Sequence, residues 1–268
     1  PPDARLGVAP HSLRAVTPGT LAALLAGHPA GPVHIHAAEQ PREVAEIEAW
    51  LGERPVAWLL ANAGVDARWC LVHATHMTEA ETTGLARSGA VAGLCPITEA
   101  NLGDGLFDGP RFLAAGGRFG VGSDSNVRIA LAEELRLLEY GQRLRDGTRN
   151  ALLAGPGSSG EALYRVALEG GARALDRSSG AIAPGRLADL LALDADHLAF
   201  AGLPREAWLD AWIFGPADGA LRDTWSAGRP CVIAGRHRAR EAVEARYRTT
   251  MQRLASRLRL DPPPETGR

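Results

Sequence analysis

The sequence predicts an α/β fold made of parallel strand–helix units, and three observations lead to this prediction. First, four short, mostly apolar runs read as strands buried on both faces, which is typical of parallel sheets. Second, segments with helical spacing separate these runs, so that strand and helix alternate. Third, from Ser178 onward the sequence pattern changes to short segments separated by glycine and proline. The four predicted strands are 33–36, 69–73, 90–94 and 117–121.

Helical segments alternate with these strands along the chain. A helix pattern follows the first strand and continues past a proline, and shorter patterns precede the third and the fourth strands. These segments are 42–51 continuing through 55–63, then 78–87, then 110–115. After the last strand, regularly spaced leucines predict an amphipathic helix over 130–144, and a second helix is predicted over 161–175.

A small β module and a basic helix are predicted after residue 177. The stretches 180–194 and 224–236 read as short strands broken by glycine and proline. The segment 240–260 is an arginine-rich helical pattern. The predicted organisation is therefore a strand–helix domain over 1–177, a small β module over 178–239, and a C-terminal helix and tail over 240–268.

The composition excludes several classes of function. A net charge of −2 offers no general attraction for nucleic acid or for an anionic membrane, so neither is expected as a partner. All 29 basic residues are arginine, which excludes chemistry that needs a Schiff-base or phosphate-loop lysine. The three cysteines are widely spaced and predict reduced thiols in the cytoplasm. No apolar run reaches the roughly 18 residues that a bilayer crossing requires.

Side chains able to bind a metal stand at the ends of three predicted strands. His36 ends the first strand, His73 ends the second, and Asp124 follows the fourth. Because the carboxyl ends of parallel strands open onto one face, these side chains are expected to converge. Glu39 is placed to move a proton of metal-bound water. Each residue alone is more simply a core histidine or a helix cap, but their joint occurrence favours a hydrolytic metal site.

These residues carry a resemblance to the later part of the amidohydrolase superfamily. The segment 36–39 resembles the strand-five His-x-x-Glu motif of its mononuclear deaminase branch, and 72–76 resembles the strand-six histidine motif. The segment 122–124 is similar to the strand-eight aspartate motif, and 184–190 to the signature of the β module. The resemblance implies a metal-dependent hydrolase with a (β/α)8 TIM barrel, here only strands four to eight, plus a small β-sandwich and a C-terminal helix.

Three further stretches, 10–16, 95–105 and 134–144, resemble the formimidoylglutamate deiminase family within this superfamily. That resemblance implies hydrolysis of a formimino C–N bond of N-formimidoyl-L-glutamate, which yields N-formyl-L-glutamate and ammonia in histidine degradation. It implies one divalent metal ion as cofactor, zinc or else iron. It also implies a small-molecule substrate that carries carboxylates, and a homodimer.

The resemblance also implies a role for each matching residue. Two residues bind the metal, three residues carry out the catalytic steps, and two residues contact the substrate. His36 and Asp124 are the implied metal ligands; Glu39, His73 and Asp124 are the catalytic groups; and His11 and Arg14 are the substrate-binding pair. The planar guanidinium of Arg14 suits a substrate carboxylate because it can pair with both oxygens. His34 and His76 are expected to orient neighbouring groups.

One feature departs from the superfamily pattern. The superfamily carries a His-x-His pair on strand one, which supplies two more metal ligands. His34 and His36 have that spacing, but the stretch from His36 to Asp124 has room for about three βα units of about 30 residues, not seven. We therefore expect this chain to lack strands one to three, to bind metal poorly by itself and to be inactive by itself.

Two alternatives stay open. The first is another deaminase or hydrolase of the same branch, acting on guanine, an adenosine derivative or a triazine. Arg14 argues against it, because neutral heterocycles do not require a carboxylate-binding arginine. The second is a non-enzymatic remnant of a truncated gene.

Overall fold

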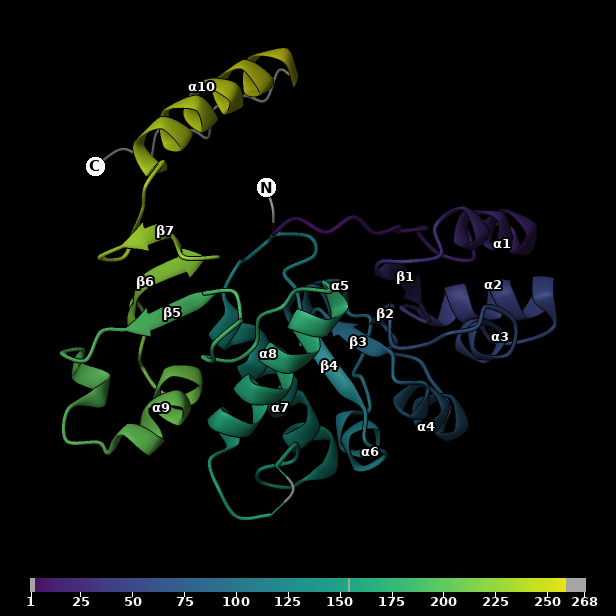
Figure 1. Cartoon of the computed structure of the whole chain (residues 1–268), viewed down its shortest axis with the longest axis horizontal. Coiled ribbons are helices and arrows are strands. Elements are labelled where there is room, and N and C mark those ends of the chain that lie inside the picture. The colour runs from purple at the N-terminus through teal and green to yellow at the C-terminus, as the bar shows by residue number, and fades with distance from the viewer. Residues whose placement is uncertain (1–2, 154, 259–268) are drawn as a thin grey trace, which may run out of the picture.

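A computed structural model describes residues 3–153 and 155–258 of the chain (Figure 1). Its main sheet has four parallel strands in the order β1-β2-β3-β4, so the predicted parallel strand–helix fold is confirmed. The four strands lie within two residues of their predicted bounds. They are β1 (Val33–Ala37), β2 (Trp69–His73), β3 (Val91–Leu94) and β4 (Arg118–Val121).

The strand preceding β1 is only partly formed. Val8 pairs with Val33, and Ser12 pairs with His36, as isolated parallel bridges. The main-chain amide of His36 also donates to the carbonyl of His11, at 2.9 Å. The segment 8–12 therefore runs alongside β1, and it brings His11 next to the end of β1.

Six helices precede β4 in the sequence, where they flank the main sheet or join its strands. They are α1 (Pro18–Gly27), α2 (Pro41–Leu51), α3 (Pro55–Asn62), α4 (Glu79–Ser88), α5 (Pro96–Leu102) and α6 (Gly109–Ala114). The predicted continuous helix over 42–63 is two helices, because Gly52 ends α2 in a left-handed conformation and Pro55 begins α3. The helices α1 and α5 were not predicted; both begin with proline, and α5 has only seven residues.

Two long helices complete this part of the fold. They are α7 (Leu131–Asp146) and α8 (Ser159–Ala174), close to their predicted positions. Helix α8 lies directly on β4, and the contact is so close that a Cβ on Gly170 would lie 2.0 Å from the carbonyl oxygen of Phe119. A glycine is required here because the two backbones leave no space for a side chain.

A second, antiparallel sheet follows α8. Its strands are β5 (Leu190–Leu193), β6 (Leu221–Ser226), β7 (Arg229–Ile233) and β8 (Arg236–His237). Two short 3-10 turns (Leu198–Phe200 and Arg205–Ala207) and helix α9 (Trp208–Phe214) lie between β5 and β6. Helix α9 packs against α7 and α8, so part of the predicted β module contributes to the core of the first domain.

The C-terminal helix α10 (Arg240–Leu258) extends away from both sheets, and none of its residues is buried (Figure 1). The arginine-rich helix predicted over 240–260 is present as far as Leu258, and its last two residues and the predicted tail beyond residue 260 lie outside the described residues. No helix among the described residues is both long enough and apolar enough to cross a membrane.

Arg177, which follows α8, joins the second sheet to the N-terminal segment. Its guanidinium binds the carboxylate of Asp189 at 2.5 and 2.9 Å, and that of Asp3 at 3.2 Å. The Asp3 carboxylate also accepts a hydrogen bond from Arg229 of β7, at 2.7 Å. The hydrogen bond with Arg177 lowers the pKa of Asp189 to about 2. This network fixes the small sheet at the end of α8.

The junction is expected to weaken in acid. A carboxyl whose pKa is lowered on folding stabilises the folded state above its ordinary pKa of about 4, and that stabilisation is lost as the pH falls toward 2. We therefore expect the wild type to lose stability between pH 5 and pH 3 more steeply than Asp189→Asn, as measured by urea unfolding. Asp196→Asn removes an exposed carboxylate and is the control. Equal slopes for wild type and Asp189→Asn would contradict the assignment.

Candidate metal centre

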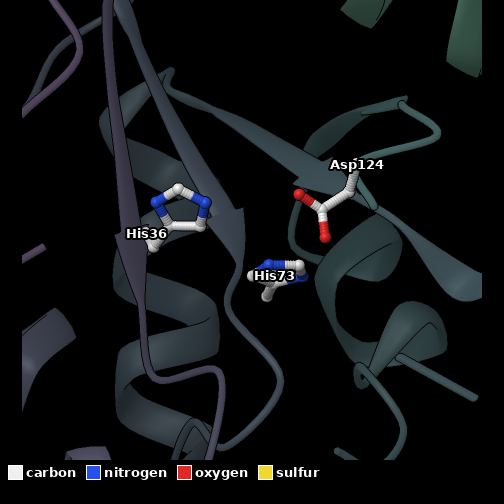
Figure 2. A group of neighbouring side chains, drawn as sticks. All are labelled: His36, His73 and Asp124. Carbon is white, nitrogen blue, oxygen red and sulfur yellow. The ribbon is translucent and has the colours of Figure 1, made fainter. Parts of the chain in front are cut away.

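Three predicted site residues converge at the carboxyl ends of the strands (Figure 2). His36 lies on β1, His73 ends β2, and Asp124 lies in the loop after β4. Their ligand atoms all lie within 4.8 Å of one another. Parallel pairing explains this convergence, because Ala37 lies opposite His73 in the β1–β2 register.

The backbone is left-handed where each of these strands ends. The φ angle is +54° at Ala38, +66° at His73 and +39° at Asp124, and none of these residues is glycine. Such conformations cost free energy and persist where the surrounding structure enforces them. They turn the chain sharply after each strand, which leaves the side chains at the open edge of the sheet.

His36 has one ring nitrogen engaged and one available. Its Nδ1 donates to the carbonyl oxygen of His11 at 2.7 Å, which leaves Nε2 free for a metal ion. The ring of His11 stacks on that of His36, with 4.8 Å between ring centroids. His11 therefore contacts the cluster from the side of the preceding segment.

His73 is completely buried between two carboxylates. Its Nε2 lies 3.6 Å from Glu39 Oε1, and its Nδ1 lies 3.1 Å from Glu99 Oε1. Burial alone lowers the pKa of His73, but the hydrogen bond with Glu99 and the charges of Glu99, Glu39 and Asp124 together raise it. The nearby carboxylates thus favour the charged form of this imidazole.

The sequence analysis did not identify Glu99 as a neighbour of His73. It lies in the stretch 95–105, which was noted only for its resemblance to the deiminase family. The available signal was a carboxylate among apolar residues at the start of a helix, four residues after Cys95. Its contact with His73 spans 26 positions and depends on the pairing of β2 with β3.

Glu39 is held by a second buried carboxylate. Glu43 accepts hydrogen bonds from the main-chain amides of Ala38, at 3.1 Å, and Glu39, at 2.8 Å. Glu43 is fully buried on α2, so the turn that carries Glu39 is anchored to the helix that follows it. The Glu39 side chain is therefore presented to the site from a fixed turn.

The donor set fits a divalent metal ion. The imidazole of His36 and the carboxylate of Asp124 are ligand types that suit zinc, and Nε2 of His73 nearby is a buried nitrogen without a hydrogen-bond partner among the described residues. Two ligands on tetrahedral zinc are about 3.4 Å apart, given bonds of about 2.1 Å. The cluster needs side-chain shifts on the order of 1 Å to reach that separation. His36 and Asp124 would hold the ion, and His73 and Glu39 lie beside them.

The remaining predicted residues lie elsewhere. Arg14 is exposed and lines a hollow of about 410 Å³ together with Glu46 and Trp50 of α2. His34 Nε2 bonds the carbonyl of Ala174 at 2.8 Å. His76 Nε2 lies 2.5 Å from the carbonyl oxygen of Asp104. Both histidines therefore link neighbouring elements, and the substrate role of Arg14 stays a prediction.

A family model and several known proteins match this chain in sequence. The model of the amidohydrolase family matches residues 4–231. The chain is 54% identical to formimidoylglutamate deiminase of Pseudomonas aeruginosa over 238 residues, which cover 88% of this chain and 52% of that protein. It is 33% identical to hydroxydechloroatrazine ethylaminohydrolase of a Pseudomonas species, over 80% of this chain and 45% of that protein.

Solved structures match as well. An amidohydrolase from Brucella melitensis superposes with a TM-score of 0.87 and 48% identity, over 93% of this chain and 55% of that one. A zinc-bound adenosine deaminase from Xanthomonas campestris gives a TM-score of 0.82 and 28% identity, over 92% and 57% of the two chains. The chain thus spans about half the length of the curated relatives it matches. The family match over residues 4–231 shows that this chain belongs to the amidohydrolase family.

Proposed function

We propose that the protein containing this chain hydrolyses N-formimidoyl-L-glutamate to N-formyl-L-glutamate and ammonia. The 54% identity to formimidoylglutamate deiminase, which extends over 88% of the chain, carries this proposal. The convergence of His36, His73 and Asp124 supports it, because hydrolysis of a C=N bond needs activated water and a proton carrier. We also propose a homodimer in the cytoplasm, on the strength of the family resemblance.

The chain's residues divide the reaction between them. A bound zinc ion would lower the pKa of a water molecule and so supply the nucleophile at neutral pH. Asp124 accepts the first proton of that water, and His73 hydrogen-bonds the oxygen as it adds to the formimino carbon. Glu39 delivers one proton to the terminal nitrogen as the oxygen adds, and then takes up the hydroxyl proton of the tetrahedral carbon. The proton held by Asp124 passes to the same nitrogen, the C–N bond breaks, and the nitrogen leaves as ammonia. The carbon keeps the oxygen and becomes the formyl group.

Ammonia release tests the substrate. In a protein of the relatives' length that contains this chain, we expect turnover of formimidoylglutamate and none of guanine or adenosine. Ammonia from guanine or adenosine instead would favour the alternative deaminase function. No ammonia from any of the three would favour a non-enzymatic protein.

Arg14 is expected to determine recognition of the substrate carboxylate. Arg14→Met should raise KM for formimidoylglutamate by about 10- to 100-fold, because a charged hydrogen bond contributes roughly 1.5–3 kcal/mol. The value of kcat should change much less, since the arginine binds a part of the substrate that does not react. Arg87→Met, an exposed arginine of α4, is the control. An unchanged KM in Arg14→Met would reject this role.

A further inference from the structure

We propose that Glu99 positions His73 by holding the neutral form of its imidazole in the tautomer that carries the proton on Nδ1, with Nε2 turned into the site. The catalytic consequence of this arrangement rests on the proposed function. The tautomer itself is a property of this chain and can be measured without any turnover. Glu99 is therefore a positioning residue, which acts through His73.

The environment of His73 leaves the two ring nitrogens in different situations. The residue is 0% exposed, so bulk water does not reach its ring. Nδ1 has Glu99 as a partner at 3.1 Å, whereas Nε2 has no hydrogen-bond partner among the described residues. Leaving a buried nitrogen without a hydrogen-bond partner costs free energy. The fold sustains this cost at the point where Nε2 faces the Glu39 carboxylate, at 3.6 Å.

The Glu99 carboxylate is also held by the main chain at the start of α5. Its Oε1 accepts a hydrogen bond from the main-chain amide of Cys95 at 2.9 Å, and only 4% of the residue is exposed. An ionised carboxylate has no proton to donate, so Nδ1 of His73 must be the donor in their contact. In a neutral imidazole, the hydrogen bond made by one nitrogen decides which nitrogen carries the proton. Nε2 is then left with a lone pair directed into the site.

A simpler explanation is that Glu99 only caps helix α5. The chain provides a matched carboxylate that separates the two explanations. Glu134 of α7 is also buried, and its Oε2 accepts from the amide of Ile97 in the first turn of α5, at 2.9 Å. No hydrogen bond joins Glu134 to His73 in the described part of the chain. If Glu99 were only a cap, replacing either carboxylate would affect His73 equally.

The tautomer can be read from imidazole nitrogen shifts. We would record long-range 1H–15N correlation spectra of the 15N-labelled chain at pH 9, with metal removed by EDTA and the His73 signals assigned by their loss in His73→Asn. We expect Nδ1–H in the wild type and in Glu99→Gln, which keeps an oxygen acceptor. Glu99→Met removes the acceptor and is expected to move the proton to Nε2. Glu134→Gln is the control and should keep the wild-type pattern.

An Nε2–H tautomer in the wild type, or an unchanged Nδ1–H tautomer in folded Glu99→Met, would overturn the proposal. If Glu99→Met does not fold, the wild type and Glu99→Gln still decide the outcome, because Nε2–H in either one contradicts it. In a protein of the relatives' length, Glu99→Met should lower kcat by about 10- to 100-fold with KM within about twofold, as loss of orientation predicts. The Nδ1–H tautomer without turnover of formimidoylglutamate would reject the proposed function and leave this inference intact.

Discussion

Glu39→Gln is expected to lower kcat for formimidoylglutamate by about 10³-fold in a protein of the relatives' length. A glutamine side chain has nearly the same shape but cannot carry a proton, and general acid–base catalysis contributes about 10²- to 10⁴-fold. The Glu39 carboxylate is the acidic group that faces the free Nε2 of His73, at 3.6 Å. The measurement is steady-state ammonia release at saturating substrate.

Metal content and a second variant complete that experiment. Glu39 is not one of the two proposed metal ligands, His36 and Asp124, so Glu39→Gln should retain the same bound zinc per chain as the wild type. Glu48→Gln changes an exposed carboxylate on the same helix that follows β1 and should keep full activity. A Glu39→Gln enzyme that retains more than a tenth of the wild-type kcat would show that another group carries the proton.

Gly170→Ala is expected to destabilise the folded chain by about 3 kcal/mol or more. The added Cβ would lie 2.0 Å from the carbonyl oxygen and 2.5 Å from the carbonyl carbon of Phe119, both of which belong to the backbone of β4. A backbone that is hydrogen-bonded to a neighbouring strand cannot rotate away as a side chain can, so α8 has to separate from β4. Thermal unfolding should show the loss as a fall in Tm of roughly 6–12 °C.

The neighbouring glycine provides the matched control. Gly171 lies on the same helix, and a Cβ placed on it would meet no atom within 4 Å. Gly171→Ala should therefore stabilise the chain by up to about 1 kcal/mol, because alanine favours the helix more than glycine does. The two variants make the same chemical change, and their expected effects on stability have opposite signs. If both lowered Tm equally, the close packing of α8 on β4 would be refuted.

The sequence by itself determined the parallel strands and the residues that end them. Four apolar runs flanked by helical patterns left few other ways to bury those segments, and the observed strands lie close to the predicted ones. His36, His73 and Asp124 were recognisable because the carboxyl ends of parallel strands share one edge. These features depend on local periodicity and on a general rule of βα topology, and both can be read along one chain.

Only the tertiary structure decided which distant groups meet. The contact of His73 with Glu99, the packing of Gly170 on Phe119 and the contact of Arg177 with Asp3 join positions far apart in the sequence. The short helix α5 likewise carries too few residues for a periodic pattern. Periodicity fixes which face of an element is buried, but the register of strands and the approach of helices fix which atoms touch. Those contacts determine how His73 is oriented, and they cannot be read from the sequence pattern.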